Sequence, residues 1–278
     1  MTGESNTSPA RSITAAVQRA FEEGLTAVLI TLLHAGANAE TNVGAKVLVE
    51  ASGIVAGSLG APALDKVAAR YAVHFLNTRE EVRSFTVQDF APHLHEWADT
   101  QLLFERIQPE PRIVICGAGH VGASLARLAH SIGYRVSLID DRAEFLTRAL
   151  FPDEKIELIV AGNWHDAVRE AIGNGRGVSV AVVTRGHNED EECMRAVTAT
   201  QADYIGLIGS KRRTNIVLDR LREAGADEEQ LEKVHAPIGL DIGAVTPEEV
   251  ALAIMAEVVA ARRGGKGTSL SAWRRISK

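Results

Sequence analysis

The chain has 278 residues, of which 46% are hydrophobic and 24% charged, and this balance is typical of a soluble globular protein with one large or two ordinary domains. The net charge of −6 gives no basic footprint for nucleic acid, and no apolar run is long enough to cross a membrane. The two cysteines indicate no disulfide framework, and the polar N-terminus lacks the apolar core of a signal peptide, so we expect a cytoplasmic protein.

The first 108 residues predict a small α+β domain. Hydrophobic periodicity indicates a helix, a strand, a hairpin, a second helix and a further strand, over residues 11–23, 25–33, 46–50 with 54–58, 64–76 and 82–87. His93, His95 and Glu96 form a His-x-His pattern beside an acid. Because no cysteine lies near and the stretch is loop-like, we interpret it as a surface or packing feature and predict no metal site.

Two prolines in the segment Gln108-Pro109-Glu110-Pro111 predict a boundary, with a second domain over residues 109–265. This domain alternates strands with helices, the pattern of a parallel sheet covered on both faces. The expected strands are 113–116, 135–139, 156–160, 178–183 and 204–208, and the helices between them start near Val121, Arg142, Trp164 and Asp190. A last helix begins at Thr246, whose spacing to Glu249 fits a capping box. We expect residues 266–278 to form a mobile basic tail.

Residues 112–142 carry the fingerprint of a dinucleotide-binding βαβ unit. A β-branched apolar run enters a Gly-x-Gly-x-x-Gly turn, and apolar residues at helical spacing leave it. Gly117 makes the tight turn, Gly119 lets the backbone approach a pyrophosphate, and Gly122 allows close packing of helix and strand. The phosphates then face N–H groups at the helix N-terminus. The other residues of the turn are Ala118, His120 and Val121. The fold class is therefore α/β, with a Rossmann-like parallel sheet domain after the smaller α+β domain.

The second strand of this unit ends at Asp140, which lies 140 − 117 = 23 residues after the first glycine. A carboxylate at this place accepts hydrogen bonds from a ribose diol and repels a 2′-phosphate, so NAD or another adenosine ligand is favoured over NADP. Asp141 and Arg142 follow directly and belong to the same candidate site. The positive charge of Arg142 keeps NADP as the minority alternative.

Two further polar turns follow expected strands, and ligands of such sheets bind beyond the carboxyl ends of the strands. The turn after residues 178–183 contains Thr184, Arg185, Gly186 and His187. The turn after residues 204–208 contains Gly209, Ser210, Lys211 and Arg212. The second turn combines a helix start with positive charge, as anion sites do. Taken alone, however, Ser210 is an ordinary N-cap and His187 a polar turn residue rather than a catalytic base.

These turns together resemble the C-terminal half of the XdhC/CoxI family, the xanthine dehydrogenase accessory proteins. The similarity covers about residues 112–263 in the family's order. The segments that carry it are Ile-Cys-Gly-Ala-Gly-His-Val-Gly, Ile-Asp-Asp-Arg, Thr-Arg-Gly-His-Asn-Glu-Asp-Glu, Tyr-Ile-Gly-Leu-Ile-Gly-Ser-Lys-Arg-Arg and His-Ala-Pro-Ile-Gly-Leu-Asp-Ile-Gly-Ala-Val-Thr-Pro-Glu-Glu-Val-Ala. The longer segments are far more specific than the glycine pattern alone.

The N-terminal half resembles the family's other domain more loosely, through residues 43–49 and 57–60. It departs from the family pattern at two places. The stretch Ala-Gly-Ala-Asn-Ala-Glu-Thr-Asn stands where members usually have a Ser-Ala-Pro-Arg-type element, and Ala61-Pro62-Ala63 stands where they have further glycines or a cysteine before an acid. If the missing Arg and Cys help to hold the cofactor, this chain binds it weakly or uses the site differently.

The resemblance implies a chaperone for the molybdenum cofactor, either molybdopterin or its dinucleotide form. Family members bind the cofactor while its terminal sulfido ligand is installed and deliver it to a xanthine dehydrogenase-type molybdenum hydroxylase. A cysteine desulfurase is then a second partner. We also expect a homodimer, because Ala-rich helices leave apolar faces to cover.

Two other functions stay open from the residues. A Rossmann site also serves NAD-dependent oxidoreductases, although no Tyr-x-x-x-Lys or similar acid/base pair lies beside the turns. A domain that binds NAD purely as a regulatory signal needs no such pair. We therefore favour the accessory protein without turnover of its own and assign no catalytic residue.

Overall fold

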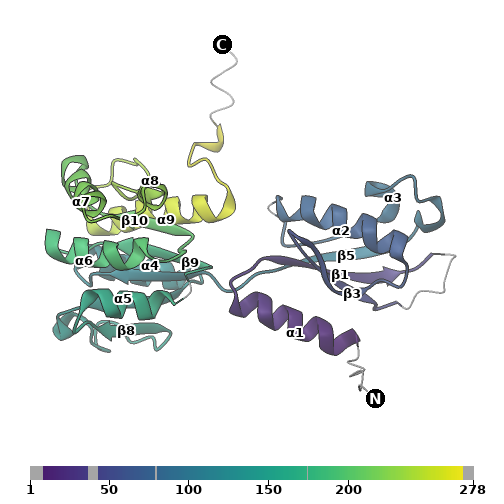
Figure 1. The fold of residues 1–278 in the computed structure, drawn as a ribbon, viewed down its shortest axis with the longest axis horizontal. Coiled ribbons are helices and arrows are strands. Elements are labelled where there is room, and N and C mark those ends of the chain that lie inside the picture. The colour runs from purple at the N-terminus through teal and green to yellow at the C-terminus, as the bar shows by residue number, and fades with distance from the viewer. Residues whose placement is uncertain (1–8, 37–42, 79, 174, 272–278) are drawn as a thin grey trace, which may run out of the picture. The chain divides into compact units, whose positions relative to one another are not determined.

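The computed structural model describes residues 9–36, 43–78, 80–173 and 175–271. The chain forms two compact units, Met1–Pro109 (unit 1) and Glu110–Lys278 (unit 2) (Figure 1). The expected basic tail is described only as far as residue 271. Part of it therefore lies outside the described residues, and so do residues 37–42, where the chain departs from the family's Pro-Arg element.

Unit 1 contains a five-stranded sheet in the order β3-β2-β1-β5-β4, and every neighbouring pair is antiparallel. The strands are β1 (Ala27–His34), β2 (Lys46–Glu50), β3 (Gly53–Ser58), β4 (Val82–Thr86) and β5 (Gln101–Ile107). The sequence analysis missed β5, although its buried Leu102 and Phe104 alternate with more exposed residues. The hairpin of β2 and β3 is as expected.

Among the described residues of unit 1, four helical segments accompany this sheet: α1 (Pro9–Glu22), α2 (Pro62–Leu76), α3 (Val87–Phe90) and the 3₁₀ turn η1 (His95–Trp97). Helix α2 places Leu64, Ala68 and Phe75 in the core, a spacing that puts them on one face. The stretch around His93 and His95, expected as a loop, contains η1.

Unit 2 contains a six-stranded parallel sheet in the order β11-β10-β9-β6-β7-β8. The strands are β6 (Arg112–Cys116), β7 (Arg135–Asp140), β8 (Ile156–Val160), β9 (Val178–Val182), β10 (Tyr204–Leu207) and β11 (Val234–His235). Numbered from β6, this is the order 6-5-4-1-2-3 of a dinucleotide-binding Rossmann sheet. The expected α/β class is confirmed, with β11 as a strand that the sequence did not reveal.

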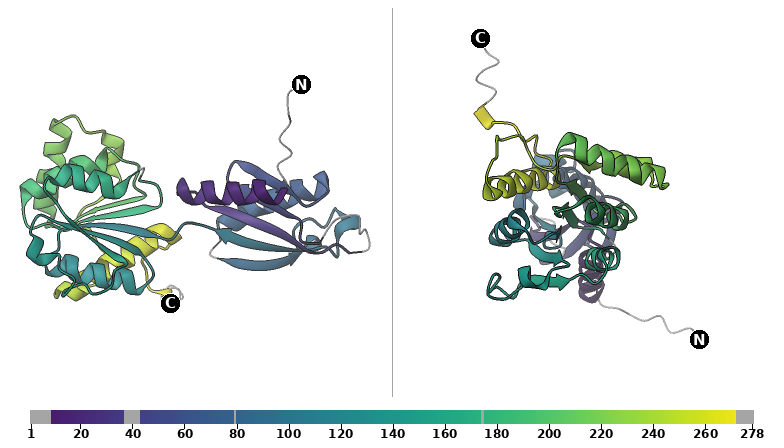
Figure 2. Two further views of the ribbon diagram at one scale, coloured as in Figure 1. Left: turned by 90° about the horizontal axis from the view of Figure 1, so that it is seen from below. Right: turned by 90° about the vertical axis from the view of Figure 1, so that its left-hand side faces the viewer.

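Helices cover both faces of this sheet (Figure 2). Helices α4 (His120–Ser131) and α9 (Pro247–Arg263) pack on one face. On the other lie α5 (Trp164–Ile172), α6 (His187–Thr198), α7 (Lys211–Glu223) and the short α8 (Glu228–Glu232). The expected capping box of α9 is present, since the Glu249 backbone N–H donates to Thr246 Oγ1 at 3.3 Å. None of the helices in the described part of the chain combines the length and hydrophobicity that a bilayer crossing requires.

One expected helix is wrong. The segment that starts near Arg142 forms only the 3₁₀ turn η2 (Ala143–Phe145). Phe151 in this segment is 1% exposed and fills the core, and the Arg148 guanidinium donates to the carbonyls of Phe151, Asp153 and Ile156. The Arg148 side chain thus supplies hydrogen bonds to backbone carbonyls that a helix would otherwise supply. Helix α6 also starts earlier than expected, at His187 instead of Asp190.

Candidate functional site

The candidate site lies at the carboxyl ends of β6 and β9, where the strand order reverses. The chain runs from β6 to β7 and β8 on one side, whereas β9 pairs with β6 on the other. Such a switch point is where open α/β sheets bind their ligands. The backbone N–H of Val183 donates to Cys116 O at 2.8 Å, so the two strand ends are joined directly below the glycine-rich turn.

Two of the three glycines are explained by contacts within the protein. Gly117 has φ +112°, and a Cβ there would lie 2.6 Å from Val183 O. Gly122 lies in the first turn of α4, and a Cβ there would lie 1.8 Å from Gly117 O. Any larger residue at either position must therefore move backbone. Both match the roles expected from the sequence, a tight turn and a close approach of helix to strand.

Gly119 differs from its two neighbours in the motif. It is the N-cap of α4 with φ −65° and ψ −173°, angles open to any residue, and no atom lies within 4 Å of a Cβ built on it. The folded chain therefore does not require glycine here. A glycine that the fold does not need, at a helix N-terminus whose first N–H groups lack intrahelical acceptors, leaves room for an anion to reach the backbone.

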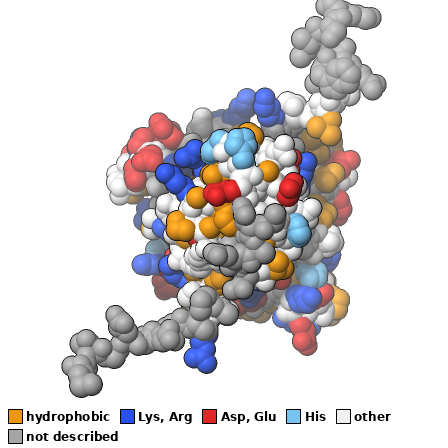
Figure 3. Space-filling view, turned by 90° about the vertical axis from the view of Figure 1, so that its right-hand side faces the viewer, with side chains coloured by type: hydrophobic (Ala, Val, Ile, Leu, Met, Phe, Trp, Pro, Cys, Tyr) orange, Lys and Arg blue, Asp and Glu red, His pale blue; other side chains and the backbone are white. Residues whose placement is uncertain are grey.

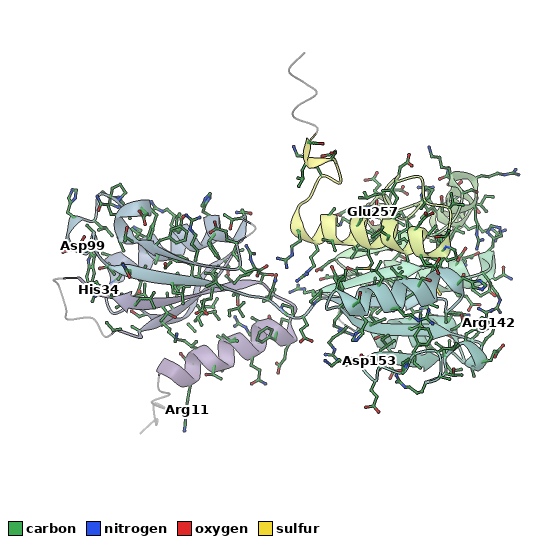
Figure 4. All side chains as sticks on the ribbon, turned by 180° about the vertical axis from the view of Figure 1, so that it is seen from behind. Arg11, His34, Asp99, Arg142, Asp153 and Glu257 are labelled. Carbon is green, nitrogen blue, oxygen red and sulfur yellow. The ribbon has the colours of Figure 1, made fainter. Side chains whose placement is uncertain are left out.

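Asp140 ends β7, as the sequence predicted, but its side chain is enclosed by the protein. Its side chain is 1% exposed, and its carboxylate accepts from Ala118 N at 2.7 Å and from Arg142 Nε and Nη2 at 2.9 and 3.0 Å (Arg142 is labelled in Figure 4). Burial acts to raise the pKa of Asp140, but these hydrogen bonds outweigh it and hold the pKa below its usual range. The carboxylate fixes the glycine-rich turn, so the expected contact with a ribose diol is not available to it in this structure.

The exposed acid at this place is Asp141. Arg185 binds it with both guanidinium nitrogens, Nη1 and Nη2, at 2.8 and 2.9 Å, and also lies 3.4 Å from Glu189. Asp141 follows β7 and Arg185 follows β9, and these two strands flank β6, so the ion pair passes over the end of β6. Because the pair is partly exposed, it contributes little to stability and can exchange for a ligand.

A buried network joins the two remaining turns. Asp190 is fully buried and accepts from Thr184 Oγ1 at 2.5 Å and from Arg213 Nη2 at 2.5 Å. Burial raises the pKa of Asp190 in spite of these hydrogen bonds. Thr184 Oγ1 also lies 3.2 Å from Gly186 O. The turn after β9 and the first turn of α7 are thus held together by one carboxylate.

The turn after β10 presents the positive charges. Ser210 is the N-cap of α7, with its hydroxyl accepting from Arg213 N at 3.3 Å, which is the structural role weighed from the sequence. Gly209 has φ +148°. Lys211 and Arg212 are exposed and pair with no acid among the residues that the structure describes. Exposed residues His120 and His187 begin α4 and α6. The first turn of α4 also contains the half-buried Val121.

A third turn, residues 238–243, is anchored by Glu257 of α9, which is labelled in Figure 4. One Glu257 oxygen accepts from Gly239 N at 2.8 Å and from the Tyr204 hydroxyl at 2.5 Å, and the other lies 3.4 Å from His235 Nδ1. Burial and the carboxylate raise the pKa of Tyr204, so the phenol stays a donor. These contacts fix the turn and do not form part of the glycine-rich site.

Sequence reasoning missed Asp190 and Arg213 as determinants of the site. Asp190 is an acid on the buried side of an expected helix start, three residues after His187, and an acid at a buried helical position needs a cationic partner. The position of Asp190 could therefore be noticed in the sequence, but its partner Arg213 could not be identified there.

Cys116 and Cys193 are free and buried, and burial beside Cys116 raises the pKa of Cys193. Over the described ranges, no three His, Cys, Asp or Glu side chains gather as metal ligands would.

Comparison with known families and proteins identifies relatives of both units. Residues 113–258 match the family model described as the XdhC Rossmann domain, and residues 20–86 match the model of the XdhC and CoxI family. A Bacillus subtilis protein named as a probable xanthine dehydrogenase subunit is 30% identical over 172 residues, which are 62% of this chain and 48% of that protein. An uncharacterized Escherichia coli protein, YqeB, is 34% identical over 157 residues, 56% of this chain and 28% of that one.

Among solved structures, a xanthine dehydrogenase from Bacillus halodurans superposes with a TM-score of 0.50 at 16% identity, over 94% of this chain and 99% of that one. At this identity the likeness concerns the fold alone. The chain spans less than half the length of the two curated relatives.

Proposed function

The chain belongs to the XdhC and CoxI family, and we therefore propose that it is an accessory protein of a xanthine dehydrogenase-type molybdenum hydroxylase. In this proposal it binds the molybdenum cofactor, protects it while the terminal sulfido ligand is installed, and delivers it to the hydroxylase. A cysteine desulfurase is the second partner, and the accessory protein acts as a homodimer without turnover of its own.

The observation that carries the proposal is the open space at Gly119. In the dinucleotide form of the cofactor a pyrophosphate links the pterin part to a nucleoside. The N-terminus of α4 offers such an anion N–H groups that lack intrahelical acceptors, and Gly119 puts no side chain in the way. The residues of unit 2 therefore fit the nucleotide end of such a cofactor. When bound, the cofactor supplies the molybdenum that the hydroxylase uses in its own reaction.

The side chains around the turn would hold the rest of the nucleotide. We assign the ribose contact to Asp141, because it is the exposed acid at the end of β7, whereas Asp140 is enclosed. A ribose that takes Asp141 frees Arg185, whose guanidinium suits a phosphate. Lys211 and Arg212 add positive charge from the neighbouring strand end.

Unit 1 provides less support for cofactor binding at residues 61–65, the segment where family members often carry a cysteine. The acid of this segment, Asp65, accepts from Leu59 N and from the Ser58 hydroxyl, both at 2.6 Å. It thus ties the end of β3 to the first turn of α2. No thiol stands in this segment, so this chain does not offer molybdenum a sulfur ligand there.

Loss of the chain in a host that carries the hydroxylase tests the proposal. We expect the hydroxylase purified from such cells to be folded but depleted of molybdenum and inactive, and we expect the wild-type chain to restore both. Gly119→Val should fail to restore them. Gly162→Val is the matched control, because Gly162 also has nothing within 4 Å of its Cβ but lies after the edge strand β8. A hydroxylase with full molybdenum content in the absence of the chain would contradict the proposal.

Partner binding is tested by pulling down the tagged chain and measuring its mass in solution. We expect the hydroxylase and a cysteine desulfurase to copurify, and a mass of two chains. A chain that changes its oligomeric state on adding NAD but binds neither enzyme would instead support an NAD-sensing role, and hydride transfer with a substrate panel would support an oxidoreductase.

A further inference from the structure

A small pocket lies in unit 1, on the outer face of α2 where it meets α3 and the turn after it. Its volume is about 160 Å³. Helix α2 contributes Val67, Arg70, Tyr71 and His74, which are spaced so that they lie on one face. Phe90 and His93 line it from the α3 side. All of these residues belong to unit 1, so the pocket is separate from the glycine-rich site.

An aromatic cluster makes the base of this pocket rigid. The Tyr71 ring stacks on Phe90 with centroids 4.6 Å apart and planes 18° apart. It also meets Phe85 and Phe104 edge-on at 5.0 and 5.5 Å. Phe104 is fully buried in the core. The position of the tyrosine ring is therefore fixed by its aromatic neighbours.

The polar groups around the pocket are all donors. Arg70 carries a guanidinium, His74 and His93 each carry at least one imidazole N–H, and Tyr71 carries a hydroxyl. Figure 3 shows a face of unit 1 on which histidine side chains lie beside those of Lys and Arg. Burial raises the pKa of Tyr71, so its hydroxyl keeps the proton. Within the described ranges, none of these four side chains makes a hydrogen bond or ion pair with the protein, and no acid lines the pocket.

The acids nearest to Tyr71 are engaged elsewhere. Asp89 accepts from Thr86 N at 2.7 Å and closes the capping box of α3. Glu80 forms an ion pair with Arg83, whose guanidinium also lies 4.9 Å from the Phe85 ring centre. Both acids therefore have partners outside the pocket, and neither lines it.

We propose that this pocket binds a phosphate-sized oxyanion, either free or as the terminal phosphoryl group of a small ligand. Drug-sized ligands need about 300–1,000 Å³, so the pocket admits one tetrahedral group rather than a whole cofactor. Arg70 supplies the charge and a forked donor, and the imidazoles and the tyrosine hydroxyl supply further hydrogen bonds. A metal ion does not fit, because Arg70 repels it and neither a third histidine nor an acid lines the pocket.

The test uses the full chain in phosphate-free buffer, with imidazole resonances observed by NMR. His74 and His93 are assigned from the variants His74→Gln and His93→Gln, and His34 on β1 is the internal control. Inorganic phosphate should shift the His74 and His93 signals together and leave His34 unchanged. Arg70→Gln should weaken this binding at least tenfold. Lys66→Gln removes a charge from the same helix outside the pocket and should not.

Ribose 5-phosphate distinguishes the two sources of the anion. Binding at least tenfold tighter than that of inorganic phosphate identifies the terminal group of a larger ligand, and equal binding identifies the free ion. Either result supports the site. The proposal is overturned if neither probe shifts the two histidine signals, or if Arg70→Gln binds phosphate as the wild-type chain does while its other resonances show a folded protein.

Discussion

The glycine-rich site of unit 2 and the pocket of unit 1 differ in whether the backbone or the side chains form them. In unit 2 the backbone forms the site, through Gly117, Gly119 and Gly122, and the charged side chains around it bind one another. In unit 1 the side chains form the pocket, and its donors bind nothing in the described structure. The aromatic base of the unit 1 pocket packs on the core of its unit, but its donor groups lie at the surface.

This difference predicts how each site responds to substitution. The close backbone contacts of Gly117 and Gly122 and the buried carboxylates of unit 2 cannot change without loss of stability, whereas Gly119 can be replaced at little cost to the fold. A site made of exposed donors can lose ligand affinity while the fold stays intact, because surface substitutions cost little. Substitutions at the two sites therefore separate the two cases.

Arg213→Ala should have the largest effect on unit 2. It leaves the fully buried Asp190 without its cationic partner, and we expect a loss of about 3 kcal/mol, the low end for breaking a buried ion pair, because Arg213 itself is 28% exposed. Denaturant unfolding measures the loss. Arg212→Ala removes the neighbouring, exposed arginine and should stay within about 0.5 kcal/mol of wild type. Equal effects of the two variants would show that Asp190 does not anchor the turns.

Gly122→Ala should cost about 2 kcal/mol, because its Cβ would lie 1.8 Å from Gly117 O and backbone must move to admit it. Gly119→Ala is the matched control three residues earlier, with open space around the Cβ, and should cost less than about 1 kcal/mol. Thermal unfolding of both variants decides the point. A Gly119 variant that unfolds as readily as the Gly122 variant would remove the argument that the space at Gly119 is kept for a ligand.

Gly119→Val should weaken nucleotide binding at least tenfold, about 1.4 kcal/mol, since its side chain occupies the approach to the α4 N-terminus. Calorimetric titration with NAD and with a pterin dinucleotide gives the affinities, and Gly162→Val again provides the comparison. Unchanged affinity for every nucleotide would mean that the glycine-rich turn does not bind one.

Asp140→Asn should remove part of the acid sensitivity of unit 2. The folded pKa of Asp140 is depressed, so its ionised form stabilises the fold above the unfolded value near 4, and this contribution is lost as the pH falls through the folded pKa. The variant should be about 1 kcal/mol less stable at neutral pH and should show a flatter decline below about pH 4. Denaturant midpoints between pH 2 and pH 7 measure both slopes, and parallel slopes would contradict the assignment.

Arg70→Gln should have the smallest effect on stability, within about 0.5 kcal/mol, although it removes the main charge of the unit 1 pocket. A loss of several kcal/mol would place Arg70 in the structural framework and end the contrast between the two sites.

Backbone constraints were readable in the sequence, and side-chain partnerships were not. The roles of Gly117 and Gly122 and the capping box of Thr246 follow from local geometry, and all three agree with the structure. The helix expected after Arg142 is wrong, because Arg148 satisfies that segment through tertiary hydrogen bonds that no local pattern reveals.

The positions of the acids and histidines also depend on tertiary contacts. Spacing placed an acid at the end of β7 but did not tell that Asp140 turns inward and Asp141 outward, since that choice depends on Arg142 and Arg185. The sequence pattern groups His93 with His95, two residues further along the chain. In the folded chain it lies with Arg70 and His74, brought there by the packing of α3 against α2. The nucleotide contacts of the candidate residues stay predictions.

The most direct test of the proposed function is to identify what the chain carries. The protein is purified from a host that makes molybdenum cofactor and then denatured, the released small molecules are identified by mass spectrometry, and molybdenum is counted per chain. We expect pterin, in its dinucleotide form, and molybdenum in near-stoichiometric amounts. NAD or another nucleotide without pterin or molybdenum would contradict the cofactor role and leave unit 2 as a binding module for that nucleotide.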